Sequence, residues 1–144
     1  MPFISITRLR VRSLRFMPGF VLYVIQARSQ VRSAAGFQDG GLLADRSLTF
    51  WTKTAWDSEE SMRRYMTSGS HKKVMPKLMD WCDEASMVHW EQSGAVLPSW
   101  AEADRRMRAD GRASKVRKPS PQHGTLSYRT PRLAGAVPIR SAGK

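Results

Sequence analysis

Cysteine is almost absent from this sequence, since Cys82 is the only one among 144 residues. No disulfide can form within the chain, and the Cys/His spacings of zinc sites are missing. Glycine-rich phosphate loops and nucleophile elbows are missing too. The apolar run at residues 20–25 is far shorter than the ~20 residues that span a bilayer. Arginines between residues 8 and 15 interrupt any signal-peptide pattern, so we expect a cytoplasmic protein.

Acidic residues are also few, with twelve Asp and Glu against twenty-four Lys and Arg, which leaves a formal net charge of +12. Residues 102–144 hold eleven of the basic residues and only three acids. From residue 112 onward the chain is rich in Pro, Gly and Ser without periodicity, which is typical of disorder. We therefore expect a disordered basic tail over residues 112–144. Such a tail either only aids solubility or makes weak, unspecific contacts with nucleic acid or an anionic membrane.

Upstream of the tail, the hydrophobic pattern switches between the strand and helix periods. β-Branched and aromatic residues predict strands at residues 3–12, 42–44, 48–56 and 87–91, with a turn at residues 39–41 before the second strand. Helical spacing covers residues 15–34, and again residues 57–82 with a break at 68–70. Asp57 with Glu60 predicts a capping box at the start of the latter helix. The order β-α-β-β-α-β is that of a ferredoxin-like α+β fold, a four-stranded antiparallel sheet with both helices on one face.

This pattern divides the chain into a domain at residues 1–97, a docking helix at residues 98–111 and the tail. Ser99 and Glu102 predict a capping box for the docking helix. Helices on a single face would leave the other face of the sheet open, although large apolar residues such as Trp51 and Trp90 are poorly suited to water. A second copy stacking sheet on sheet would cover that face, so we expect a homodimer.

Residues 49–71 carry a resemblance to a known family. A strand ending in Trp56 is followed by an acidic cap at Asp57, by Met62, and by Ser68, Gly69 and Ser70 before His71. This pattern resembles the antibiotic-biosynthesis-monooxygenase-like branch of the dimeric α/β-barrel superfamily. The first strand and long helix are also similar to spheroidene monooxygenase, a heme-dependent member. The resemblance covers about residues 3–91 and implies a dimeric α/β barrel with a pocket between each sheet and its helices.

The resemblance also implies a monooxygenase-like oxidoreductase that acts on an apolar, ring-bearing small molecule, with heme or with no cofactor. The chain departs from the heme-degrading members, which use an Asn on the first strand and a Trp and a His on the second helix. It contains no Asn, and Tyr65 and Met75 stand near the places of that Trp and His. Heme degradation therefore fits poorly. A non-catalytic dimeric binding module of the same fold, or a polyanion-binding protein that works through the tail, are the alternatives.

His71 is the first catalytic candidate, because an imidazole facing a pocket serves as a general base or as an axial heme ligand. Its alternative role is a backbone hydrogen bond near the start of a helix. Tyr65 is the second catalytic candidate. The residues proposed to bind substrate are Trp51, Met75, Arg8 and His89. Cys82 has no basic neighbour in the sequence that would make it a thiolate, so we assign it to the core.

Overall fold

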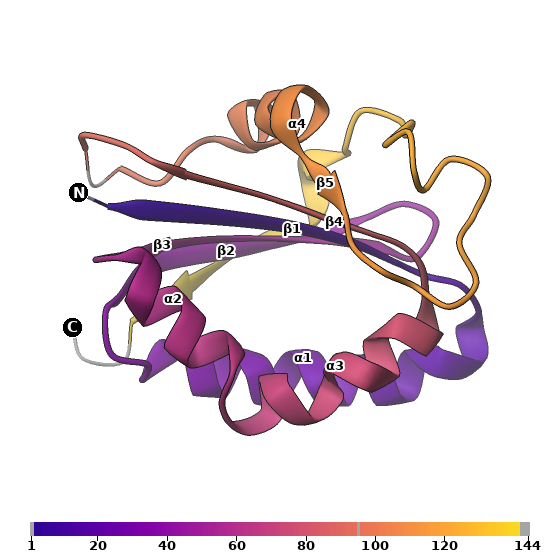
Figure 1. Ribbon diagram of the computed structural model, residues 1–144, viewed down its shortest axis with the longest axis horizontal. Helices are drawn as coiled ribbons and strands as arrows, with labels where there is room; N and C mark the ends of the chain where they lie inside the picture. The colour runs from indigo at the N-terminus through magenta and orange to yellow at the C-terminus, as the bar shows by residue number, and fades with distance from the viewer. Residues whose placement is uncertain (1, 95, 142–144) are drawn as a thin grey trace.

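The computed structural model describes residues 2–94 and 96–141, which are built on one antiparallel sheet. The sheet has six strands in the order β5-β4-β1-β3-β2-β6. Their bounds are β1 (Phe3–Val11), β2 (Phe37–Asp45), β3 (Thr49–Trp56), β4 (Cys82–Glu91), β5 (Arg112–Ala113) and β6 (Ala136–Arg140). Figure 1 shows α1 (Met17–Arg32), α2 (Glu59–Met66) and α3 (Gly69–Trp81) on one face of the sheet, and α4 (Trp100–Asp110) on the other. Two short 3-10 helices, Leu14–Phe16 and Leu133–Gly135, precede α1 and β6.

The four central strands confirm the mixed α+β fold, because β1 lies between β3 and β4 and β2 pairs with β3. Side chains alternate along β1, as the strand period requires. Ile4 and Ile6 pack in one cluster with Trp100 of α4. Ser5 and Thr7 face the helical layer instead. The sheet thus separates two compartments, one under α1, α2 and α3 and one under α4.

Two strands are longer than the sequence predicted. β2 runs straight through Asp39, Gly40 and Gly41, where a turn was expected. A Cβ on Gly40 would lie 2.9 Å from the Lys53 carbonyl oxygen, so this glycine serves a close approach of neighbouring backbones and not a turn. β4 begins at Cys82 instead of residue 87, and its acidic start is compatible with a strand because Glu84 pairs with Arg8 on β1.

The start of α2 also differs from the prediction. The N-cap is Ser58 and not Asp57, because the Ser58 hydroxyl accepts the backbone N–H of Ser61 at 3.2 Å. The break between α2 and α3 lies at Thr67 and Ser68, so it meets the predicted break at residues 68–70 only at Ser68, because α3 already begins at Gly69. The first turn of α4 matches its prediction, since the Ser99 hydroxyl accepts the Glu102 N–H at 3.1 Å.

The segment expected to be disordered supplies two strands. β5 pairs with β4, and β6 pairs with β2 from Asp39↔Arg140 to Leu43↔Ala136. Ile139 of β6 is buried in a cluster with Phe37 and Trp56. Pro138 is tolerated because β6 is an edge strand. Local periodicity did not reveal β6, because its stability depends on pairing with a strand almost a hundred residues away.

α4 covers the sheet face that the sequence left open. Trp100, Ala103 and Met107 are buried against Ile4, Ile6 and other residues of that face. The chain thus covers this face with its own helix. A second copy stacked sheet on sheet is not needed to cover it. None of the helices among the described residues is long and apolar enough to cross a membrane.

Candidate active site

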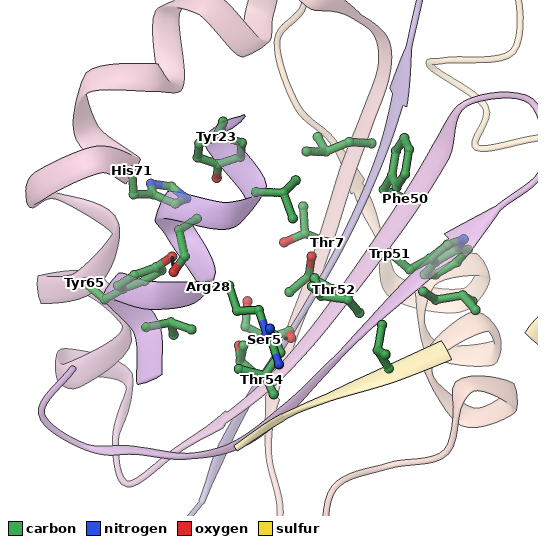
Figure 2. Close-up of a pocket in the computed structure, with 18 of the residues that line it drawn as sticks. Ser5, Thr7, Tyr23, Arg28, Phe50, Trp51, Thr52, Thr54, Tyr65 and His71 are labelled. Atoms are coloured by element: carbon green, nitrogen blue, oxygen red, sulfur yellow. Dashed lines mark hydrogen bonds between the residues drawn. The ribbon is translucent and has the colours of Figure 1, made fainter. Parts of the chain in front are cut away.

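A cavity of about 280 Å³ lies between the sheet and the layer formed by α1, α2 and α3 (Figure 2). Its walls are mainly apolar and come from β1, β2, β3, β6 and the three helices. Three of its lining residues are exposed, namely Arg28, Ala44 and Val137. The mouth therefore lies between α1 and the β2–β6 edge of the sheet. Few polar groups line the cavity, and they determine what chemistry it can support.

The His71 imidazole carries the most reactive of these polar groups. Its Nδ1 lies 3.0 Å from the Met66 carbonyl oxygen, which can only accept a hydrogen bond. Nδ1 therefore carries the proton and Nε2 keeps its lone pair. Burial lowers the pKa of His71, although the bond to the Met66 carbonyl opposes that shift. His71 is thus held as a neutral base with a defined tautomer.

Two tyrosines flank this imidazole, as Figure 2 shows. The ring centroid of His71 lies 5.3 Å from that of Tyr65 and 6.4 Å from that of Tyr23. Burial raises the pKa of Tyr65 to about 12 and raises the pKa of Tyr23 as well. Both phenols therefore stay protonated near neutral pH and are available as hydrogen-bond donors. The Tyr65 hydroxyl lies 3.4 Å from the Ala27 carbonyl oxygen, so this donor is only weakly engaged.

The sheet side of the cavity carries a row of hydroxyl groups, and a cation reaches toward them. The row consists of Ser5, Thr7, Thr52 and Thr54. Arg28 extends from α1 toward Ser5 and Thr54 in Figure 2. Among the described residues, Arg28 has no hydrogen bond or ion pair. Its charge is therefore available to an anionic group inside a largely apolar cavity.

Arg28 was not among the residues that we predicted for the site. A signal was present, since Arg28 follows Val24 by four residues and so lies beside the inward stripe of α1. The hydroxyl row also escaped notice. Its four residues alternate along two neighbouring strands, namely Ser5 and Thr7 on β1 and Thr52 and Thr54 on β3. Only the tertiary structure shows that this face of the sheet lies under the helices.

Only two of the six predicted site residues face the cavity as expected. Tyr65 and His71 lie side by side in it. Trp51 borders the cavity, but Figure 2 shows its ring on the far side of the strand, where it contacts Tyr128 at a centroid distance of 5.5 Å. Its indole belongs to the cluster under α4.

The other three predicted substrate-binding residues lie elsewhere. Arg8 sits on the opposite sheet face, where it bonds Glu84 at 2.7 Å. Met75 is 37% exposed on α3 and does not line the cavity. His89 points to the helical side but packs beside Phe3, at a ring distance of 5.5 Å, outside the cavity lining. Residue type had suggested these positions, and strand register and helix rotation exclude them.

A heme is a poor fit to this cavity. Its volume of about 280 Å³ lies just under the ~300–1,000 Å³ range of pockets for drug-sized ligands, and a tetrapyrrole is larger than such ligands. The bond from His71 Nδ1 to a carbonyl would suit an axial ligand, but the volume of the cavity suits a smaller molecule. Within residues 2–94 and 96–141, no group of three or more His, Cys, Asp and Glu side chains is arranged to hold a metal ion.

Solved structures with the same fold include a cofactor-independent oxygenase. SnoaB from Streptomyces nogalater, described in those words, shares 12% identity at a TM-score of 0.53, over 66% of this chain and 96% of its own. A "putative antibiotic biosynthesis monooxygenase" from Nitrosomonas europaea shares 14% identity at a TM-score of 0.58, over 66% and 93%. Rv0793 from Mycobacterium tuberculosis shares 10% at a TM-score of 0.59, over 67% and 100%. These similarities confirm the fold that the sequence resembled.

The family model that matches this sequence covers more of the chain than the similar solved structures do. No curated protein shows a matching sequence. A family model described as "Domain of unknown function (DUF3291)" matches residues 10–118. This match includes α4, which contributes to the closed sheet face. The chain is therefore a member of the DUF3291 family, built on the fold of the antibiotic-biosynthesis-monooxygenase-like proteins.

Proposed function

We propose that this protein is a monooxygenase-like oxidoreductase that works without a cofactor on a compact, apolar, ring-bearing acid. The observation that carries the proposal is that one apolar cavity holds a neutral base, His71, and at its mouth a cation, Arg28, which has no ion pair among the described residues. The volume of about 280 Å³ suits a molecule of about one to three fused rings. The fold shared with a cofactor-independent oxygenase supports the same class of chemistry.

The substrate of such a reaction supplies the electrons itself. His71 Nε2 removes a proton from an activated ring CH₂ group, and the resulting carbanion adds to O₂ to form a C–O bond. The proton on His71 then passes to the outer oxygen and gives a hydroperoxide. Loss of the remaining hydrogen with cleavage of the O–O bond leaves C=O and releases water. O₂ accepts four electrons in total, and the CH₂ carbon loses the same four.

The remaining polar groups match the charges of this sequence. Arg28 would pair with the acid group of the substrate or with the oxygen of its delocalised anion. The protonated Tyr65 and Tyr23 would donate hydrogen bonds to the developing peroxide. The apolar mouth at Val137, which is 54% exposed, would admit a hydrophobic molecule.

A binding module without turnover is the second candidate function. It is favoured by the bond between His71 Nδ1 and the Met66 carbonyl, because that bond alone gives the histidine a structural role. The chain also lacks Asn altogether, whereas the heme-degrading members of the family that it resembles use an Asn on the first strand. Both candidates use the same cavity and differ only in whether His71 moves a proton.

The deciding experiment is oxygen uptake by the purified chain with a panel of polycyclic phenols and anthrone-like acids. The His71→Gln variant keeps a side chain that can donate to Met66 but has no basic nitrogen. Under the enzymatic proposal it loses turnover by at least about a hundredfold and still binds substrate. If no panel member is consumed and ligands bind both forms equally, the binding module is correct. A hemin titration followed by absorbance is expected to show no saturable band.

A further inference from the structure

A second cavity, of about 270 Å³, lies on the sheet face opposite to the candidate active site. It forms where β1, the β2–β3 turn and residues 122–129 meet. Four arginines line it, together with two carboxylates: Arg8, Arg10, Arg46, Arg129, Asp45 and Glu84. None of these residues lines the cavity that holds His71. The two cavities are therefore chemically independent.

Two of these arginines have a buried N–H group without a partner. Arg8 is only 7% exposed, and its Nε has no hydrogen-bond acceptor among the described residues. The Nε of Arg46 is likewise buried and unpaired within that part of the chain. The other known contacts of Arg8 are Glu84 at 2.7 Å and the Tyr128 ring at 4.2 Å, and Arg46 donates to the Thr130 carbonyl at 3.0 Å. A buried donor with no acceptor destabilises the fold unless something else fills its place.

The carboxylates of the cavity are already engaged with other donors. Glu84 accepts hydrogen bonds from Arg8 and from the Ser120 hydroxyl, and it forms an ion pair with Arg10. One oxygen of Asp45 accepts the backbone N–H groups of Arg46 and Arg132, at 2.8 and 3.0 Å. Within residues 2–94 and 96–141, the protein therefore supplies no acceptor to the two unpaired donors.

The charge of the cavity is positive even when its neighbours are counted. Arg10 also forms a bidentate pair with Asp83, which lies outside the cavity lining. Three carboxylates thus stand against four guanidinium groups, which leaves one positive charge. Arg129 is exposed and has no ion pair within the described part of the chain, so it can turn toward a ligand. Ser47 and Thr49 place hydroxyl groups in the same cavity.

We infer that this cavity is a binding site for an oxyanion, namely the carboxylate or phosphate group of a small molecule held by Arg8, Arg46 and Arg129. An oxyanion presents at least two acceptor oxygens, and the cavity gathers the guanidinium groups of Arg8, Arg46 and Arg129, which can donate to them. The tight β2–β3 turn, with Ser47 and Leu48 at φ of 59° and 56°, fixes Arg46 at the cavity edge. The site adds a ligand to the protein that the oxygenase proposal does not require.

The test is a titration of the full chain with inorganic phosphate and, separately, with acetate, at constant ionic strength set by NaCl. Arginine Nε–H signals in ¹H–¹⁵N NMR spectra report directly on the groups in question. The expected result is saturable shifts of the Arg8 and Arg46 signals. Arg46→Gln is expected to weaken binding at least about tenfold. Arg63→Gln is the matched control, because Arg63 is exposed and paired only with Glu59 on α2.

The two titrations identify the ligand class by their relative affinity, since tighter phosphate binding indicates a phosphate group and tighter acetate binding a carboxylate. Shifts that stay linear with both anions overturn the inference, as does an equal loss of affinity in Arg63→Gln. If circular dichroism shows that Arg46→Gln is unfolded, Arg129→Gln replaces it. The Arg129 side chain is exposed, so its removal leaves the fold intact. Unchanged affinity in that variant also overturns the inference.

Discussion

Gln30 of α1 holds the first turn of α3 at His71. Its side-chain oxygen accepts the His71 backbone N–H at 3.3 Å, and its amide nitrogen donates to the Ser68 carbonyl at 3.0 Å. The helix that carries Arg28 is thereby joined to the helix that carries His71. Gly69 lies under this link with φ of +57°, and a Cβ there would be 2.9 Å from Gln30 Nε2.

The first prediction concerns this glycine. Gly69→Ala forces a side chain into a left-handed conformation and against Gln30, so we expect a loss of about 1–2 kcal/mol in the free energy of unfolding. Turnover should fall as well, because His71 follows two residues later. Urea denaturation and oxygen uptake measure the two effects. Gly94→Ala is the control, since nothing lies within 4 Å of its Cβ position, and equal effects in both variants would contradict the prediction.

The second prediction concerns the pH dependence of the rate. Because burial lowers the pKa of His71, its Nε2 stays unprotonated below the ordinary value of 6.5. The rate should therefore hold constant as the pH falls through 6.5 and drop only at lower pH. A pH profile of kcat/KM tests this. An acidic limb with its midpoint at or above 6.5 would show that another group is the base.

The third prediction follows from the same shift through linkage to folding. The folded state binds a proton at His71 less readily than the unfolded chain does, so stability falls as the pH drops from 6.5 to the lowered folded value. The pKa of His89 is also lowered by burial and contributes in the same direction. The comparison of wild type with His71→Gln by urea denaturation isolates the His71 share. A pH dependence of equal size in both proteins would refute it.

The fourth prediction concerns Arg28 as the partner of an acidic substrate. Arg28→Met keeps the length and apolar body of the side chain and removes its charge. We expect KM for a ring-bearing acid to rise roughly 10- to 100-fold, while KM for the neutral ester of the same molecule changes little. Lys72→Met, an exposed cation on α3 that does not line the cavity, is the control. If Arg28→Met has the same KM for the acid as the wild type, Arg28 does not bind the acid group of the substrate.

The fifth prediction concerns the sheet face under α4. Met107 is fully buried there, so Met107→Ala should cost about 2–5 kcal/mol of unfolding free energy. Arg105→Ala, on the exposed side of the same helix, should cost little.

Light scattering of the full chain tests the expected homodimer. If light scattering shows a dimer, its two copies must meet through a surface other than the sheet face that α4 covers.

The sequence predicted those parts of the fold that depend on local pattern. β1, β3, α1 and the capped start of α4 each follow from hydrophobic periodicity or a capping residue. β6 and the acidic start of β4 were missed, because their stability comes from partners on distant strands. Glu84 reads as a poor strand residue until Arg8 is found beside it.

The places of the predicted site residues show the same limit. His71 was chosen because the break at Ser68, Gly69 and Ser70 marks a helix start before it, and Tyr65 because it stands near the place of a Trp in the resembled family. Arg8 and Met75 were placed wrongly, because residue chemistry does not reveal strand register or helix rotation. Arg28 has a local signal in its four-residue spacing from Val24, but its place at the cavity mouth depends on where α1 lies over the β2–β6 edge.

The cavity wall contributed by β6 has a consequence for the order in which the protein matures. Val137 and Ile139 close one side of the cavity, and they follow every helix and all other strands along the chain. During synthesis, α1 and the four central strands can emerge and pair well before these residues leave the ribosome. The nascent chain would therefore fold first around an unfinished cavity. Its ability to take up a ligand would arise only once β6 has paired with β2.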